Sequence, residues 1–271
     1  MMKTILITGA SSGIGKETAK LFHAKGWNVV ATMRNPESDI ELGELENILV
    51  AKLDVLDPSS IDHAVNEGIA RFGQIDVLLN NAGYGAYGVL ESFSREQIIR
   101  QFDTNVIGLL DVTRALLPHF RSNKSGIIIN VSSIGGKMSF PLGTLYHGTK
   151  FAVEGISESL NFEVQEFGGK VKIVEPGAIA TDFTGRSLDF SNDESMTEYQ
   201  LIIGKLLAAT QAMFGDASPA SVVAGVIFEA ATDGTDQLRY TAGDDAKAII
   251  AQRQQADDAT FTGIIKSQFG L

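Results

Sequence analysis

The sequence has no cysteine in 271 residues, which excludes disulfide bonds, thiolate metal sites and catalysis by a thiol. Positive charge is scarce as well. The 22 lysines and arginines stand against 33 aspartates and glutamates, and the formal net charge is −11. A surface of this sign repels nucleic acid and anionic lipid, so we expect neither a nucleic-acid partner nor a membrane partner.

Long apolar runs are also missing, since none approaches the ~20 residues that span a bilayer. The first residues, Met1 to Thr8, lack the pattern of a signal peptide, and we expect a cytoplasmic protein. The four histidines, His23, His63, His119 and His147, show no metal-ligand spacing, so no metal site is predicted. His147 adjoins Tyr146 but would point about 100° away on a helix, and we assign it no catalytic role.

Short apolar runs alternate with longer amphipathic segments, which is the pattern of a parallel sheet with helical crossovers. We predict strands near 3–8, 27–32, 48–53, 75–80, 125–131, 170–175 and 237–241. The predicted helices are 13–25, 58–72, 94–122, 145–167 and 218–232. The fold class is therefore α/β: one domain over residues 1–271, with a Rossmann-type doubly wound parallel sheet of about seven strands and helices on both faces.

One segment, residues 182–217, breaks this alternation, because a plain crossover to the next helix would not need it. It contains a helix-like stretch from Met196 to Phe214. Long insertions after strand ends are often lids or binding loops, so we predict a substrate-binding segment. The alternative is a surface excursion without a role.

Three polar residues, Ser133, Tyr146 and Lys150, have the spacing of a proton-transfer site. A helix would place Tyr146 and Lys150 on one face, one turn apart. A phenol ordinarily titrates near pH 10, and an ammonium close by is expected to lower its pKa toward the working range. A serine hydroxyl beside it could hold a carbonyl or alcohol oxygen, so the pattern predicts protonation of a carbonyl while a hydride reaches its carbon.

A glycine-rich turn, Thr8 to Gly15, follows the first predicted strand and begins the first predicted helix. Gly9, Gly13 and Gly15 permit a tight turn and close approach of the backbone to a pyrophosphate, which the helix N-terminus also attracts. The spacing is G-x3-G-x-G rather than G-x-G-x-x-G. Its position in a βαβ series nevertheless favours a dinucleotide.

The end of the second strand bears on which dinucleotide binds. An acidic side chain that would hold a ribose 2′-hydroxyl is missing from Val29 to Asn35, and Arg34 is present instead. A guanidinium suits a phosphate dianion, and the Ser12 hydroxyl could add a donor. We therefore expect NADP(H). If Arg34 is only a solvated surface residue, the preference stays open.

Together these residues resemble the short-chain dehydrogenase/reductase family over about residues 3–180. The resemblance implies that Ser133, Tyr146 and Lys150 are catalytic and that Asn105 positions a water in the proton relay. It also implies cofactor binding by Tyr146 and Lys150 and by residues of the glycine turn, the second to fourth strand ends and the turn near 176–181: Gly9, Ser11, Ser12, Gly13, Ile14, Gly15, Arg34, Asp54, Val55, Asn81, Ala82, Gly83, Pro176, Gly177, Ile179 and Thr181.

The family's serine-to-tyrosine spacing selects Ser133 rather than Ser132, which would then be structural. Asp54 would bind the adenine amino group, with a backbone contact from Val55; the alternative is that Asp54 caps a turn. Thr149 departs from the serine that the family more often has before the lysine, a conservative change.

The predicted function is hydride transfer between NADP(H) and a ketone, aldehyde or secondary alcohol. Candidate substrate-wall residues are mostly apolar, so we expect a carbonyl reductase of hydrophobic substrates, with Ser133, Tyr146, Phe140 and Phe183 binding the substrate. The wall also draws on Tyr84, Met138, Leu142, Leu188, Phe190, Met213 and Phe214. These same side chains could instead pack the long segment against the domain. The sequence resembles the branch that includes 17β-hydroxysteroid and retinol dehydrogenases through 31–34 and 135–138.

Three alternatives remain open: reduction of a carrier-bound 3-oxoacyl group, a nucleotide-sugar epimerase, and a non-catalytic NADP(H) sensor. The first would call for a basic patch, the second for another glycine spacing and a larger C-terminal domain. The third would call for loss of Tyr146 or Lys150, and both are present. The family also implies a homodimer or homotetramer formed through the helices near 94–122 and 145–167.

Overall fold

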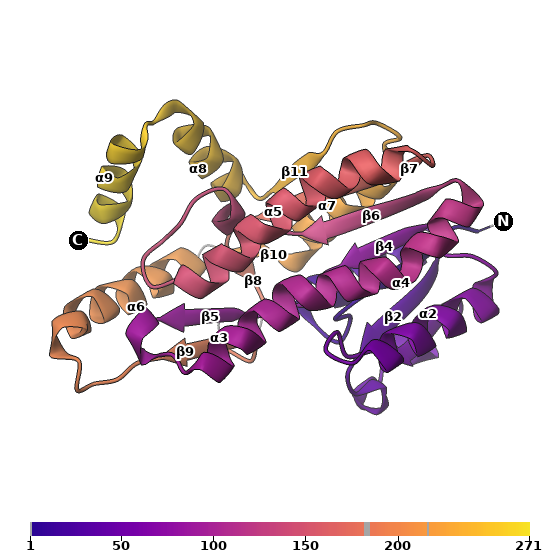
Figure 1. The fold of residues 1–271 in the computed structure, drawn as a ribbon, viewed down its shortest axis with the longest axis horizontal. Helices are drawn as coiled ribbons and strands as arrows, with labels where there is room; N and C mark the ends of the chain where they lie inside the picture. Colours follow the sequence, from indigo (N-terminus) through magenta and orange to yellow (C-terminus); the bar gives the residue numbers. More distant parts are fainter. Residues whose placement is uncertain (1, 182–184, 216) are drawn as a thin grey trace.

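A seven-stranded parallel sheet forms the centre of the protein (Figure 1). The computed structural model describes residues 2–181, 185–215 and 217–271, with backbone alone at 211–214. The sheet has the order β11-β7-β6-β4-β1-β2-β3 and consists of β1 (Thr4–Ile7), β2 (Asn28–Met33), β3 (Ile48–Lys52), β4 (Val77–Asn80), β6 (Gly126–Val131), β7 (Gly169–Pro176) and β11 (Arg239–Ala242). The predicted α/β fold and its seven strands are confirmed.

The strands form where apolar residues run without alternation. All four residues of β1 and all six of β2 are buried, because helices cover both faces of the sheet. Helices α1 (Gly13–Ala24) and α7 (Ala220–Thr232) pack on one face around Phe22 and Ile227. On the other face lie α2 (Pro58–Phe72), α4 (Gly108–Asn123) and α5 (Thr144–Gln165), with Phe120 among the buried residues. The domain is therefore a three-layer sandwich.

The helix predicted over 94–122 is interrupted. The chain forms α3 (Arg95–Phe102), then a π-helical turn over Asp103–Ile107, and then α4. A π-turn inserts one extra residue into the helix, and such insertions are frequent at functional sites. Asn105 is buried within this turn and hydrogen-bonds the backbone of Tyr84, which follows β4.

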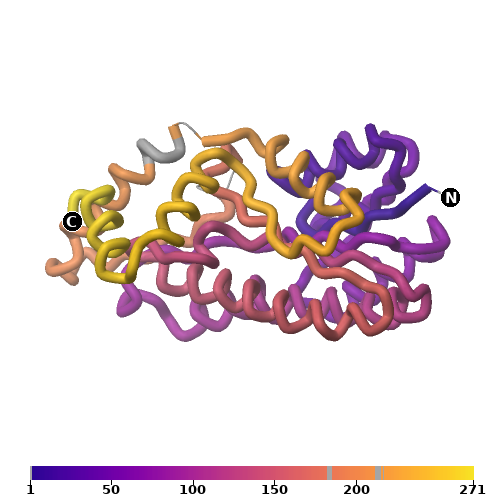
Figure 2. Tube along the Cα trace, turned by 90° about the horizontal axis from the view of Figure 1, so that it is seen from above, coloured from indigo at the N-terminus to yellow at the C-terminus, as the bar shows by residue number. Residues whose placement is uncertain are grey.

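The C-terminal part of the chain adds elements that the sequence did not predict. Helices α8 (Asp244–Gln255) and α9 (Asp258–Gln268) follow β11, and they lie at the same end of the protein as α6 (Gln200–Gly215) (Figures 1 and 2). Small parallel sheets pair β5 (Gly85–Gly88) with β9 (Leu188–Ser191) and β8 (Ile179–Ala180) with β10 (Ser218–Pro219). A third apolar cluster, containing Ile134, Met138, Leu206, Phe261 and Phe269, joins these helices to the loop before α5.

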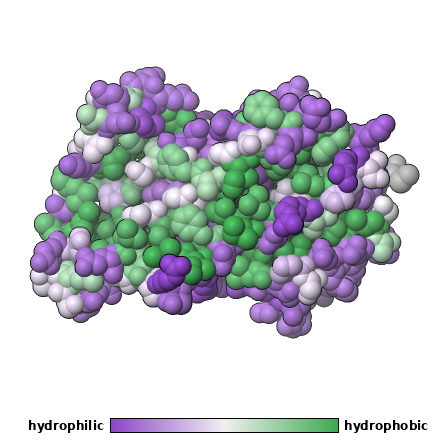
Figure 3. Space-filling view, in the orientation of Figure 1, coloured by the Kyte–Doolittle hydropathy of each residue, from purple (hydrophilic) through white to green (hydrophobic). Residues whose placement is uncertain are grey.

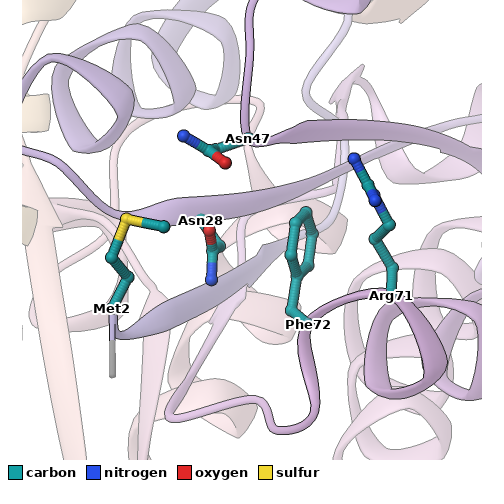
Figure 4. Close-up of a pocket in the computed structure, with 5 residues that line it drawn as sticks. All are labelled: Met2, Asn28, Asn47, Arg71 and Phe72. Carbon is teal, nitrogen blue, oxygen red and sulfur yellow. The ribbon is translucent and has the colours of Figure 1, made fainter.

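A small cavity of about 310 Å³ opens at the amino edge of the sheet, where Asn28 begins β2 and Phe72 ends α2 (Figure 4). It lies at the opposite edge from the polar residues singled out in the sequence. In the described ranges, no helix is long and apolar enough to cross a membrane.

Candidate active site

Ser133, Tyr146 and Lys150 meet beyond the carboxyl end of β6. Ser133 has extended backbone and begins a short 3-10 turn, accepting a hydrogen bond from the Gly135 amide at 3.0 Å. Its side chain is also hydrogen-bonded to Tyr146. Lys150, one turn along α5, donates from Nζ to the Val131 carbonyl at 2.9 Å and lies 5.7 Å from the centre of the Tyr146 ring. The structure thus brings the three predicted residues together, with Ser133 rather than Ser132 beside the phenol.

The expected lowering of the Tyr146 pKa is wrong for this arrangement. Burial raises the pKa of Tyr146 to about 12, and the hydrogen bond with Ser133 opposes that rise only in part. The Lys150 ammonium lies beside the ring and donates to a backbone carbonyl, and its charge does not outweigh the desolvation of the phenolate. Burial also lowers the pKa of Lys150 to about 8, against the opposing effect of Glu154. Tyr146 is therefore a protonated acid at neutral pH.

Asn105 connects the π-turn to both neighbouring segments. Its Nδ2 donates to the Tyr84 carbonyl at 2.9 Å and to Thr149 Oγ1 at 3.1 Å, and its Oδ1 accepts from the Tyr84 amide at 3.0 Å. Thr149 in turn donates to the Tyr146 carbonyl at 2.7 Å. The hydroxyl at position 149 therefore links Asn105 to the helix turn that holds the phenol. The role predicted for Asn105 in a proton relay stays a prediction.

The glycine turn has the conformation that a phosphate cradle requires. Gly9 and Gly13 have φ values of +69° and +54°, which glycine adopts at least cost. A Cβ at Gly15 would overlap the Gly9 carbonyl and lie 2.7 Å from Asn81 Nδ2. The Asn81 amide group fixes the turn by donating to the carbonyls of Thr8 and Gly9 at 2.9 and 3.1 Å. Ala82 and Gly83 follow on the same edge, where the Ala82 amide bonds Thr8 Oγ1 and Gly83 lies against Asn105.

The start of α1 fits the pyrophosphate of a dinucleotide. Ser12 is the N-cap residue, yet its side chain makes no capping hydrogen bond, so the amides of the first turn are not satisfied by the cap. Ser12 Oγ accepts a hydrogen bond from Arg186 instead. The sequence had not singled out Arg186, which comes from the long segment after β7. Arg34 lies exposed just after β2.

The remaining cofactor positions gather around this turn. Thr181 lies against Gly13. Pro176 ends β7, and the Gly177 amide donates to the Ala242 carbonyl at 3.1 Å. Ile179 is buried in the core. Sequence reasoning missed Asp245 of α8, whose Oδ2 accepts from the Ala178 amide at 2.7 Å and so supports this turn.

Asp54 caps a turn, which is the alternative role predicted for it from the sequence. Its Oδ1 accepts a hydrogen bond from the Leu56 amide at 3.0 Å, which caps the turn after β3. Val55 is buried in the second apolar cluster, against Gly108 of α4. Binding of an adenine amino group by Asp54 stays a prediction.

The predicted substrate wall is only partly at the site. Phe140 packs its ring against His147 and Phe269, at 5.5 and 6.2 Å between ring centres, and Met138 is buried with the C-terminal helices. Phe183 lies outside the described residues, as do the side chains of Met213 and Phe214. A residue not predicted, Tyr87 of β5, packs its ring against Tyr146 in a tilted arrangement, with ring centres 5.4 Å apart. Burial raises the pKa of Tyr87 well above its ordinary value, so it too is a neutral phenol.

Comparison with known proteins identifies the family. A model of the short chain dehydrogenases matches residues 3–191. The chain is 49% identical over 239 residues to an uncharacterized oxidoreductase of Schizosaccharomyces pombe, which covers 88% of this chain and 100% of that protein. It is 44% identical over 180 residues to a 3-ketodihydrosphingosine reductase of Bacteroides thetaiotaomicron, covering 66% of this chain and 65% of that protein. The chain belongs to the short-chain dehydrogenase family of oxidoreductases.

Solved structures agree with this assignment. A short-chain dehydrogenase from Streptomyces avermitilis superposes with a TM-score of 0.83 at 34% identity, covering 99% of this chain and 98% of that one. ElxO with bound NADP superposes with a TM-score of 0.73 at 28% identity, covering 89% and 98%. A 3-ketoacyl-(acyl-carrier-protein) reductase from Brucella melitensis, in complex with NADH, has a TM-score of 0.76 at 25% identity, covering 90% and 98%. Similar proteins thus bind either dinucleotide.

Proposed function

We propose that the protein is an NADP(H)-dependent reductase of hydrophobic ketones or aldehydes, or the corresponding secondary-alcohol dehydrogenase. The observation that carries the proposal is the Tyr146 phenol hydrogen-bonded to Ser133, with Lys150 one helical turn away. All three lie at the same edge of the sheet as the glycine turn. We include Asn105 as the fourth catalytic residue because it links this helix turn to the π-turn.

Each of the four residues has its own role in the proposed reaction. Ser133 and Tyr146 hold the substrate oxygen, and Tyr146 donates the proton because it is neutral at working pH. Lys150 holds the nicotinamide ribose and provides a positive charge that stabilises the phenolate left behind. A bound nicotinamide dinucleotide supplies the redox chemistry. Asn105, which we assign to the proton relay, is held beside α5 by its hydrogen bond to Thr149.

Preference for NADP(H) rests on Arg34 and Ser12. Arg34 follows β2 in an exposed position, with no carboxylate in the stretch where a 2′-hydroxyl partner would be expected. ElxO, whose structure contains NADP, and the NADH-bound Brucella reductase show that the fold accepts either cofactor. The guanidinium favours the phosphorylated one.

A hydrophobic substrate is supported by a groove of about 440 Å³ beside the start of α5. The groove includes Leu142 of the predicted substrate wall and two residues of the long segment. It is lined by Gly88, Val89, Leu90, Glu91, Leu142, Thr144, Tyr199 and Ile202. Most of these side chains are apolar, as in typical small-molecule sites. The relative from Bacteroides is named a 3-ketodihydrosphingosine reductase, and a ketone substrate is consistent with the proposal. We propose residues 182–217 as the substrate-binding segment of a single cytoplasmic domain.

A homodimer or homotetramer is part of the proposal. Large apolar side chains are exposed on α5 and along the α3 to α4 segment: Ile99, Phe102, Ile107, Phe151 and Phe162. Figure 3 shows apolar residues on the face where these helices lie in Figure 1. Water-exposed phenylalanines in such number favour burial against a second copy.

The experiment that tests the function measures oxidation of NADPH and of NADH with carbonyl substrates of graded chain length. Tyr146→Phe should remove most turnover, a loss of about 10²- to 10⁴-fold, while NADPH binding by fluorescence stays nearly unchanged. Arg34→Ala should raise KM for NADPH by roughly 10- to 100-fold and leave KM for NADH unchanged. Turnover retained by Tyr146→Phe would show that another group donates the proton.

A further inference from the structure

One arginine of the long segment after β7 contacts the glycine turn. Arg186 lies two residues before β9, and its guanidinium donates a hydrogen bond to Ser12 Oγ at the start of α1. The two residues are 174 positions apart in the sequence, so only the folding of the chain brings them together. The reaction proposed above assigns Arg186 no role.

The paired strands β5 and β9 hold the backbone next to Arg186. The Gly85 amide donates to the Ser187 carbonyl at 2.9 Å, and Gly85 pairs with Leu188 in the parallel ladder. Strand β5 comes shortly after Asn81, whose side chain donates to two carbonyls of the glycine turn. One segment of the chain thus supports both the turn and the backbone beside Arg186. Support of this kind reduces the conformational entropy that a long side chain loses when it binds a ligand.

The hydrogen bond between Arg186 and Ser12 keeps the start of α1 able to bind an anion. Ser12 is the N-cap residue, but its hydroxyl accepts from Arg186 and makes no capping bond to an amide of the first helical turn. Those amides have no partner within the helix. The guanidinium and the N-terminus of α1 therefore lie next to each other, and both attract negative charge.

Arg186 forms no ion pair within the part of the chain that the structure describes. The ion pairs of arginine found there involve Arg114, Arg239 and Arg253. The Arg186 side chain is exposed, and the hydrogen bond to Ser12 occupies one of the five N–H donors of a guanidinium. In a protein with a formal net charge of −11, such a group is well suited to bind a phosphate.

We propose that Arg186 binds the pyrophosphate of the dinucleotide, as a further cofactor-binding residue that comes from the substrate-binding segment. This inference rests on the cofactor site of the proposed function. A glycine turn and the helix N-terminus after it are the parts of this fold that hold a pyrophosphate, and Arg186 is hydrogen-bonded to the residue before the helix. Arg34 follows β2 instead, where the ribose is expected. Arg186 therefore contributes to binding of both NADPH and NADH, and Arg34 to binding of NADPH alone.

The test measures the dissociation constants of NADPH and NADH from the fluorescence of the reduced nicotinamide, without a carbonyl substrate. Arg186→Gln should weaken binding of both dinucleotides by about 5- to 30-fold. Arg34→Ala should weaken binding of NADPH only. Arg71→Gln is the matched control and should change neither constant. Arg71 is also exposed and forms no ion pair among the described residues, but it lies at the opposite edge of the sheet, beside the cavity of Figure 4.

A salt titration separates a phosphate contact from a structural role. Sodium chloride should weaken NADPH binding more steeply for the wild type than for Arg186→Gln, because the variant has one positive charge fewer at the ligand. Arg186→Lys keeps that charge and should keep most of the salt dependence. The unfolding temperature of the cofactor-free protein should be the same for the wild type and Arg186→Gln, since the side chain is exposed.

Equal affinities of the wild type and Arg186→Gln for both dinucleotides overturn the inference and leave the proposed function in place. A loss confined to NADPH also overturns it, because it would assign Arg186 to the 2′-phosphate. So does a lower unfolding temperature with unchanged salt dependence, which would assign a structural role. A wild type that binds neither dinucleotide refutes the proposed function and the inference with it. If the predicted losses are found but the wild type reduces no carbonyl, the inference holds and the proposed activity fails.

Discussion

At the scale of single residues, the imidazole of His147 sets the shape of the loop before α5. Its Nε2 accepts a hydrogen bond from the Phe140 amide at 3.0 Å, and its Nδ1 lies 3.0 Å from the Gly135 carbonyl. Both bonds are satisfied together only by the neutral ring with its proton on Nδ1. From its angle on the helix, the sequence predicted no catalytic role for His147. That angle does not reveal that His147 holds the loop between Ser133 and α5.

The pH dependence of stability follows from that ring. His147 is 4% exposed, and burial lowers its pKa below the ordinary value of 6.5. On acidification the unfolded chain therefore takes up the proton first, and stability falls as pH drops from 6.5 toward the folded-state pKa. His147→Leu should remove this dependence and cost about 2–5 kcal/mol, because two backbone groups lose their partner.

The measurement is urea unfolding at several pH values between 5 and 8. His63→Leu is the control, because the His63 side chain is 76% exposed and its removal should change stability by about 0.5 kcal/mol or less. An acid-dependent loss of stability that persists in His147→Leu would assign the effect to another group.

At the scale of elements, the first turn of α1 packs so closely against the glycine turn that a side chain at Gly15 would overlap its neighbours. Gly15→Ala would push a methyl group against the Gly9 carbonyl and Asn81, so the turn must open. We expect a stability loss of about 1–3 kcal/mol and weaker NADPH binding. Gly225→Ala of α7 has nothing within 4 Å and should instead stabilise the protein by about 0.5–1 kcal/mol. Thermal unfolding measures the stability of the two variants, and titration with NADPH measures their affinity for the cofactor. If Gly15→Ala and Gly225→Ala change these quantities equally, the turn is not closely packed.

Elements were predictable from sequence where one local signal dominates. The buried strands are rich in apolar residues, and α2 begins at Pro58 after the Asp57 cap, as proline at the first helical position favours. The π-turn was not predictable, because it depends on hydrogen bonds from Asn105 to Tyr84 and Thr149, which are distant in sequence. The direction of the Tyr146 pKa shift was missed for the same reason: the sequence gives the lysine spacing but not the depth of burial.

At the scale of the whole molecule, the C-terminal helices link the two halves of the candidate site. Asp245 at the start of α8 supports the turn after β7, and Phe261 and Phe269 of the C-terminal part pack with Met138 of the loop before α5. Little in the sequence indicates this arrangement. Residues 244–255 contain only two large apolar side chains, Ile249 and Ile250, so their helical pattern is weak and their packing is decided by distant partners.

Because the third apolar cluster is separate from the two clusters that cover the sheet, it should open without unfolding the sheet. Phe261→Ala removes a side chain that is 6% exposed and should cost about 3–5 kcal/mol of local stability. Hydrogen exchange should then speed up in 244–271 and in the loop before α5, and stay unchanged in β1 and β4. Val222→Ala, at a position 39% exposed on α7, is the control that should alter neither region. Faster exchange spread evenly over the whole sheet would mean that the C-terminal helices, the loop before α5 and the central sheet unfold as one cooperative unit.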